Sequence, residues 1–267
     1  MAHSQTLQPV TIKSSADGGY FPAASSTATK DSAALRDIPQ SVNVVPKQLL
    51  QDQAARSMED ALKNVPGVAL SHGDGQRDQV TIRGFSAIAD QFVDGVRDDA
   101  LYFRDLSNFE RIEVLKGPSA VLYGRGSSGG LINRVTKKPI FGETTGDVTL
   151  NLGSYGLKRL SSDINLALGE AVAFRLNLAK EGSDSSRAQQ FIDRHSIAPS
   201  LAFKISADTN LLLQVTNAKD KRVTDFGIPA LNGKPVDVAV GTYYGSNKAR
   251  EDAPLPAPPA ATPSKMN

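Results

Sequence analysis

The sequence of 267 residues contains no cysteine, no tryptophan and only three histidines. Without cysteine the chain forms no disulfide. His3, His72 and His195 stand far apart, and none has a second ligand at helical spacing, so they do not indicate a metal site. The formal net charge of +2 gives no strong basic field. We therefore expect no resident metal or cofactor and no nucleic-acid partner.

Long apolar runs are also missing. No run of about 18 apolar residues occurs, which excludes a membrane-spanning helix. The first five residues lack the basic region and the apolar stretch of a secretory signal. The sequence by itself therefore gives no sign of export.

Catalytic motifs are missing as well. The sequence has no GxSxG nucleophile elbow and no plausible Ser–His–Asp set. Gly124, Gly126 and Gly129 form a GxGxxG pattern, but it lacks both a βαβ setting and a GK[ST] ending. We therefore predict that the protein is not an enzyme.

Residues 1–30 are poor in large apolar side chains and rich in Ser, Ala, Thr and Gly. Such a segment buries too little surface to offset its ordering entropy, so we expect a flexible tether. The hexamer Leu7–Ile12 is its one β-prone stretch and suits strand addition to a partner's sheet edge. Taken alone, a chance run of β-prone residues is the simpler explanation.

Residues 31–140 predict a compact α+β unit with polar, Gly-rich loops. Ser57 is the expected N-cap of a helix that Pro66 and Gly67 end. The expected helices span 47–52 and 58–64, and the expected strands span 42–45, 68–71, 79–83, 91–93 and 111–115.

Residues 144–250 alternate between apolar and polar side chains in strands of about 9–11 residues. Val148, Leu150 and Leu152, for example, alternate with polar neighbours. A period of two shows only that the two faces differ, so it fits a membrane barrel and a soluble sheet equally. The Pro- and Ala-rich end, 251–267, predicts a disordered tail.

A dense series of motifs lies in and before the segment 80–139. The motifs, in chain order, are Asp37–Val42, Leu62–Val68, Val80–Phe85, Phe92–Arg97, Phe109–Gly124 and Gly129–Pro139. Together they closely resemble the plug of TonB-dependent siderophore receptors, and the resemblance covers roughly residues 31–250. It implies an α+β plug domain, with a small mixed sheet and short helices, followed by antiparallel β strands of an incomplete transmembrane β-barrel.

The resemblance implies a receptor in the cell outer membrane that imports ferric siderophores. The iron would be carried as a chelator-bound ligand, with no cofactor. The implied partners are a ferric siderophore, outer-membrane lipid, and TonB with its inner-membrane energising complex. In this setting the hexamer resembles a TonB box, and the residues expected to bind TonB are Leu7, Pro9, Val10, Thr11 and Ile12.

The resemblance also places the siderophore against loops 72–78, 86–90 and 98–108. Guanidinium and aromatic groups suit anionic, aromatic-rich chelates, although ordinary loop roles explain such residues equally well. The residues expected to contact the siderophore are Arg77, Tyr102, Phe103 and Arg104.

Arg83, Arg111 and Lys116 are charges bracketed by apolar residues, a costly arrangement unless they are paired. The resemblance implies that Arg83 and Lys116 pair with carboxylates on the barrel wall and help to hold the plug. Pairing inside the plug, with Glu110 and Glu113, is the open alternative.

The resemblance fades near Arg250, after about five strands. Five strands cannot close a barrel around a plug, and open edges are not tolerated in lipid. We therefore predict a truncated receptor. The alternative is a soluble periplasmic ligand-binding or regulatory module without transport activity. Which siderophore is bound does not follow from the sequence.

Overall fold

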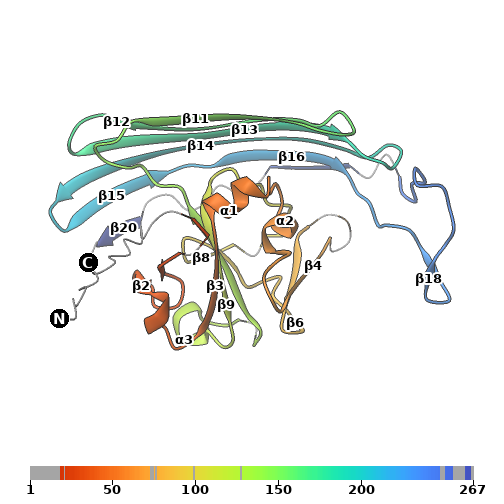
Figure 1. The fold of residues 1–267 in the computed structure, drawn as a ribbon, viewed down its shortest axis with the longest axis horizontal. Helices are drawn as coiled ribbons and strands as arrows, with labels where there is room; N and C mark the ends of the chain where they lie inside the picture. The colour runs from red at the N-terminus through yellow and green to blue at the C-terminus, as the bar shows by residue number, and fades with distance from the viewer. Residues whose placement is uncertain are drawn as a thin grey trace, which may run out of the picture.

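The computed structural model describes residues 19–20, 22–72, 75, 77–98, 100–126, 128–246, 250–254 and 262–265. Figure 1 shows an α+β unit packed against one face of a long antiparallel sheet. In the described part of the chain, no helix is long and apolar enough to cross a membrane. The hexamer Leu7–Ile12 lies outside the described residues.

The α+β unit is built on a five-stranded mixed sheet in the order β3-β9-β10-β7-β8. Strand β10 pairs antiparallel with β9 and parallel with β7. Gly130 is the first residue of β10. This position requires glycine, because a Cβ would lie 2.1 Å from the Leu115 carbonyl oxygen and the backbone φ is +135°. The strands are β3 (Ser41–Pro46), β7 (Gln91–Val93), β8 (Val96–Arg97), β9 (Phe109–Lys116) and β10 (Gly130–Thr136).

Two short helices and a second sheet enclose the main core of this unit. Helix α1 spans Lys47–Asp52, and α2 spans Met58–Leu62. The second sheet holds β4 (Val68–Ser71), β5 (Gln79–Ile82) and β6 (Phe85–Ser86). A further single-turn helix, α3, spans Ala120–Tyr123. The predicted cap of α2 is confirmed, because Ser57 and Asp60 form a reciprocal capping box.

Residues 24–37 are folded onto the unit, although the sequence placed everything before residue 31 in the tether. Strands β1 (Ala24–Ser25) and β2 (Ala33–Ala34) pair and lead into a short 3₁₀ helix, η1 (Leu35–Asp37). The buried carboxylate of Glu113 accepts hydrogen bonds from the Ser25 hydroxyl and from the backbone N–H of Thr27, the latter at 3.0 Å. Apolar packing adds to these polar contacts, since Ala28, Ala33 and Leu35 lie on a buried cluster with Phe92 and Leu115. These few apolar residues form no periodic pattern, so apolar patterning did not reveal the segment.

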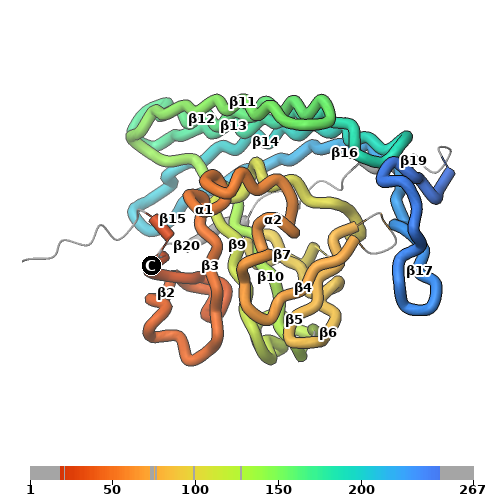
Figure 2. The backbone as a smooth tube through the Cα atoms, turned by 45° about the vertical axis from the view of Figure 1, so that its right-hand side comes forward, coloured from red at the N-terminus to blue at the C-terminus, as the bar shows by residue number. Residues whose placement is uncertain are grey.

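The long sheet continues the chain as antiparallel hairpins. Its strands are β11 (Thr145–Leu152), β12 (Lys158–Ala167), β13 (Val172–Asp184), β14 (Phe191–Ser206), β15 (Thr209–Gln214), β16 (Asn217–Val223), β19 (Arg250–Pro254) and β20 (Thr262–Lys265). β15 and β16 both pair with β14, one after the other. The small hairpin of β17 (Ala230–Leu231) and β18 (Lys234–Pro235) extends from one end of the sheet (Figure 2). The segment 251–267, expected to be disordered, contributes β20 and most of β19.

The long sheet buries its polar face and exposes its apolar face. The face that meets the α+β unit carries charged and amide side chains between 1 and 8% exposed, namely Arg159, Asp163, Asn165, Arg175, Asn177, Glu181 and Arg194. The opposite face carries leucines and isoleucines such as Leu160 and Ile197, 52 and 43% exposed. A water-soluble sheet has the reverse arrangement. The burial therefore resolves the ambiguity of the alternation in favour of the membrane-barrel type.

Candidate functional site

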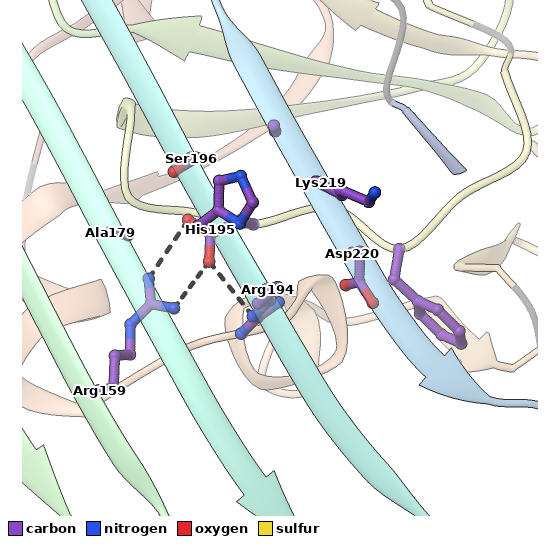
Figure 3. Close-up of a pocket in the computed structure, with 10 residues that line it drawn as sticks. Arg159, Ala179, Arg194, His195, Ser196, Lys219 and Asp220 are labelled. Carbon is purple, nitrogen blue, oxygen red and sulfur yellow. Dashed lines mark hydrogen bonds and ion pairs between the residues drawn. The ribbon is translucent and has the colours of Figure 1, made fainter. Parts of the chain in front are cut away.

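Asp105 of the α+β unit is the centre of an ion-pair cluster against the long sheet. Its carboxylate accepts two hydrogen bonds from the guanidinium of Arg159 on β12, at 2.8 and 3.2 Å. Arg194 on β14 lies 3.5 Å from the same carboxylate. Figure 3 shows Arg159 and Arg194, which come from the strands on either side of β13. Although burial acts to raise the pKa of Asp105, Arg194 and Arg159 hold it well below its ordinary value.

Glu181 on β13 balances the two guanidinium groups from the sheet side. Its carboxylate accepts hydrogen bonds of 2.7 Å from both Arg159 and Arg194, and its side chain is 1% exposed. Arg56, which precedes α2, adds an ion pair at 3.3 Å to the same carboxylate. The guanidinium groups of Arg159 and Arg194 therefore lie between two carboxylates, Asp105 of the α+β unit and Glu181 of the long sheet. The hollow beside them measures only about 10 Å³, room for about one water-sized sphere, so it is an interface and not a ligand pocket.

A second cluster joins the two parts around Asp163 on β12. Arg175 on β13 donates two hydrogen bonds of 2.8 Å to Asp163. Lys47 of α1 and Lys137 beyond β10 approach the same carboxylate to 3.2 and 3.1 Å. Buried ion pairs of this kind fix one relative position of the two parts, because separating the two partners leaves each as an uncompensated buried charge.

Loops 72–78 and 98–108 meet at the same end of the α+β unit. The backbone N–H of Asp78 donates to the Tyr102 carbonyl oxygen at 3.3 Å, and the His72 and Phe103 rings contact edge to face at 5.6 Å. The guanidinium of Arg222 on β16 lies 3.9 Å from the Phe103 ring centroid. Two of the three expected ligand loops are therefore adjacent, and both lie beside the long sheet.

Within these loops, Arg104 is a structural residue. It is 2% exposed and donates hydrogen bonds to the carbonyl oxygens of Tyr102, Asp98 and Ala100. Asp98 also accepts from the Tyr102 hydroxyl at 2.7 Å and pairs with the buried Arg134. Arg104 thus shapes loop 98–108 from inside. Tyr102 and Phe103 on this loop, and Arg77 on loop 72–78, are partly exposed. The third loop contacts different residues, since Ala89 and Asp90 line a hollow with Arg97 and Arg125.

Arg83 and Lys116 lie together at the end of the α+β unit away from the long sheet. Arg83 has a φ of +51° in the turn between β5 and β6, and its guanidinium lies over Gly117. Burial and the neighbouring charge of Arg83 lower the pKa of Lys116. Among the described residues, neither side chain forms an ion pair. Their expected pairing with a barrel wall therefore stays a prediction. Pairing inside the plug is observed for Arg111, which lies 2.5 Å from the Glu113 carboxylate, and not for Arg83 or Lys116.

Comparison with known proteins gives the family. Residues 34–131 match the family model described as TonB-dependent Receptor Plug Domain. The chain carries the plug domain of a TonB-dependent receptor. It is 36% identical over 258 residues to the probable TonB-dependent receptor BfrD of Bordetella pertussis, covering 91% of this chain and 34% of that protein.

Two further comparisons concern the catecholate siderophore receptor Fiu of Escherichia coli K12. The sequences are 34% identical over 208 residues, covering 76% of this chain and 27% of Fiu. The closed-form crystal structure of Fiu superposes with a TM-score of 0.78 at 31% identity, covering 85% of this chain and 35% of that one. The chain thus spans about a third of the length of the relatives that it matches. The match extends from the plug into the strands that follow, as expected from the motifs.

Sequence reasoning missed Asp105, Glu181 and Asp163, the residues that join plug and sheet. A signal was present for the two on the sheet. Both carboxylates occupy the polar positions of strands whose other positions are largely apolar, and Glu181 lies in register with Arg159 on the neighbouring strand. Asp105 had no such pattern, since it lies in an irregular loop.

Proposed function

We propose that this chain is the N-terminal part of an outer-membrane receptor that takes up ferric siderophores with energy supplied through TonB. The observation that carries the proposal is the inside-out sheet, whose polar face is fastened to the plug. An apolar face of this extent is stable against lipid, whereas a soluble periplasmic module would leave it in water. The receptors named for related proteins support the ligand class.

The ferric siderophore is proposed to bind at the adjoining loops 72–78 and 98–108. Arg77, Tyr102 and Phe103 offer a guanidinium and aromatic faces there, and Arg222 adds a cation stacked on Phe103. An anionic chelate with aromatic rings fits such a set. Iron enters with its chelator, so the protein need supply no metal ligand. Among the described residues, no group of three or more His, Cys, Asp or Glu side chains could hold a metal ion.

Uptake of radioactive iron tests this function. In the source bacterium, the codons for the plug, residues 34–131, are deleted in frame, and uptake is measured with a panel of ferric siderophores. We expect loss of uptake for at least one siderophore and unchanged uptake of iron that does not depend on TonB. Unchanged uptake for every siderophore of the panel, under conditions in which the gene is expressed, would refute the proposal.

The TonB box is a separate part of the proposal. A peptide spanning Leu7–Ile12 with its flanking residues should bind the periplasmic domain of TonB by strand addition. A proline in place of Val10 removes a backbone donor and should abolish the binding in calorimetry. A scrambled peptide of the same composition is the control. Equal binding by the scrambled peptide would show that the hexamer is not the recognised segment.

Arg83 and Lys116 are proposed to pair with carboxylates of strands outside this chain. The physical argument for this pairing is that the two cations lie together on the plug face away from the sheet. Two adjacent cations without a carboxylate are unfavourable unless an anionic group faces them. Exchange of both for glutamine in the complete receptor should lower uptake while leaving the plug folded.

A further inference from the structure

Tyr102, one of the residues proposed to contact the siderophore, has its polar atoms turned into the plug. Its hydroxyl donates a hydrogen bond of 2.7 Å to the Asp98 carboxylate. Its carbonyl oxygen accepts from the Arg104 guanidinium at 3.1 Å and from the backbone N–H of Asp78 at 3.3 Å. The guanidinium of Arg104 also lies 4.3 Å from the centroid of the Tyr102 ring. The hydroxyl and one ring face are therefore occupied, and the other ring face and the ring edge are left for a ligand.

Asp98 is the residue on which these contacts converge. Its Oδ2 atom accepts the hydrogen bond from the Tyr102 hydroxyl, pairs with Arg134 on β10, and lies 3.5 Å from Nε of Arg104. The side chains of both arginines are 1% exposed. Asp98 thus connects the partly exposed Tyr102 to the central strand of the mixed sheet.

The protonation states of Tyr102 and Asp98 fix the direction of their hydrogen bond. Burial and the Asp98 carboxylate raise the pKa of Tyr102 against the opposing effect of Arg134 and Arg104. Although burial acts to raise the pKa of Asp98, Arg134 and Arg104 hold it below its ordinary value. Tyr102 is therefore a neutral donor, and Asp98 is a charged acceptor.

The charges of this cluster balance only while Asp98 is ionised. Asp98 and Asp78 offset Arg104 and Arg134, and Asp78 lies 3.9 Å from Arg104. Without the charge of Asp98, two buried guanidinium groups would share one carboxylate, which is unfavourable in a buried cluster. The position of Tyr102 therefore depends on the Asp98 carboxylate.

We propose that Asp98 is the positioning residue of the siderophore site, and that it makes Tyr102 bind the chelate through its ring and not through its hydroxyl. The inference rests on the proposed siderophore uptake and deepens it. The hydroxyl cannot turn to a ligand without breaking its bond to the Asp98 carboxylate, and hydrogen bonds to charged groups are among the stronger ones. A ring held in one orientation, in contrast, packs on an aromatic ring of the chelate with little further loss of side-chain entropy.

Uptake by variants of the complete receptor tests the inference. The probe is radioactive ferric dihydroxybenzoate, a chelate of aromatic rings with anionic oxygens, and its initial uptake rate is measured against its concentration. Only uptake that is lost on deletion of residues 34–131 is counted. Y102F removes the hydroxyl and keeps the ring, whereas Y102L removes both. The matched controls are Y20F and Y20L, because the exposed Tyr20 hydroxyl also donates to a carboxylate, that of Asp52, at 2.7 Å.

We expect Y102F to keep the half-saturating concentration within about threefold of the wild-type value, and Y102L to raise it about tenfold or more. The maximal rate should be unchanged in both variants, and the controls should change neither quantity. Equal loss in Y102F and Y102L would show that the hydroxyl binds the chelate, and unchanged uptake in Y102L would show that the ring does not. Either result overturns the inference.

The uptake assay also separates this inference from the proposed function. If another siderophore of the panel enters through the receptor and ferric dihydroxybenzoate does not, the inference is wrong and the uptake proposal stands. If deletion of residues 34–131 alters the uptake of no siderophore, both are wrong.

A second measurement detects the Asp98 contact without a ligand. The chain contains six tyrosines, and isotopic labelling of their Cζ atoms gives NMR signals among which Y102F identifies that of Tyr102. D98N should move this signal and leave the Tyr20 signal in place, and a Tyr102 signal that does not move overturns the positioning role. If D98N does not fold, the comparison of Y102F with Y102L decides the inference, since Tyr102 is partly exposed.

Discussion

Substitution of Asp105 by asparagine should weaken the attachment of the plug to the long sheet. Asparagine keeps the shape and can still accept the hydrogen bond that the Ser107 N–H donates at 2.8 Å. It removes the charge that faces Arg159 and Arg194, whose side chains are 6 and 8% exposed. Two buried guanidinium groups then share the single carboxylate of Glu181. Breaking a buried pair from one side costs about 3–5 kcal/mol, and the retained hydrogen bond favours the lower end.

Urea-induced unfolding of the purified chain measures this cost. D105N should lower the free energy of unfolding by about 3 kcal/mol. The matched control is D37N, since Asp37 is 65% exposed and pairs with the 87% exposed Arg36. Its loss should stay below about 1 kcal/mol. If D105N and D37N cost the same, the plug–sheet ion pairs do not stabilise the arrangement and the reasoning fails.

The lowered pKa of Asp105 also predicts that the folded chain loses stability at acid pH. The pKa of Asp105 is held well below its ordinary value in the folded chain, whereas in the unfolded chain it is about 3.9. The unfolded state therefore binds a proton first as pH falls. The stabilisation is complete above the unfolded pKa and declines progressively below about pH 4. D105N should flatten this decline between pH 5 and 2.5, and an unchanged slope would contradict the assignment.

Three other substitutions test the fold. G130A should cost about 3 kcal/mol or more, because its Cβ would meet the Leu115 carbonyl oxygen at 2.1 Å, whereas G146A, with open space around it, should be nearly neutral. Equal stability of the two would show that β9 and β10 can separate without cost. S57A should remove the capping box of α2 and lower stability by about 1 kcal/mol in the same urea assay. R83A should change the stability of this chain by less than about 0.5 kcal/mol, since Arg83 is exposed and has a like charge as neighbour. A larger loss would mean that Arg83 holds the plug together from within.

Local sequence rules predicted correctly those helices and strands that depend on residues close together in the sequence. The positions of α1, β4 and β7 agree with the prediction, and α2 ends only two residues early. Strand β10 was missed, although its motif was recognised, because it is buried on both sides and shows no alternation. The segment around Ser25 was also missed, since its partner Glu113 lies 88 positions away.

The sequence by itself determined the family, the two-part organisation and the alternation of the strands, because motifs and period-two patterns are properties of short segments. Only the tertiary structure decided which face of the long sheet is covered. Alternation is symmetric between the two faces, and packing against the plug breaks that symmetry. It also decided that Asp105, and not Arg83 or Lys116, joins the plug to these strands. Asp105 and Arg159 are 54 positions apart, and a contact at that separation depends on how whole elements are packed.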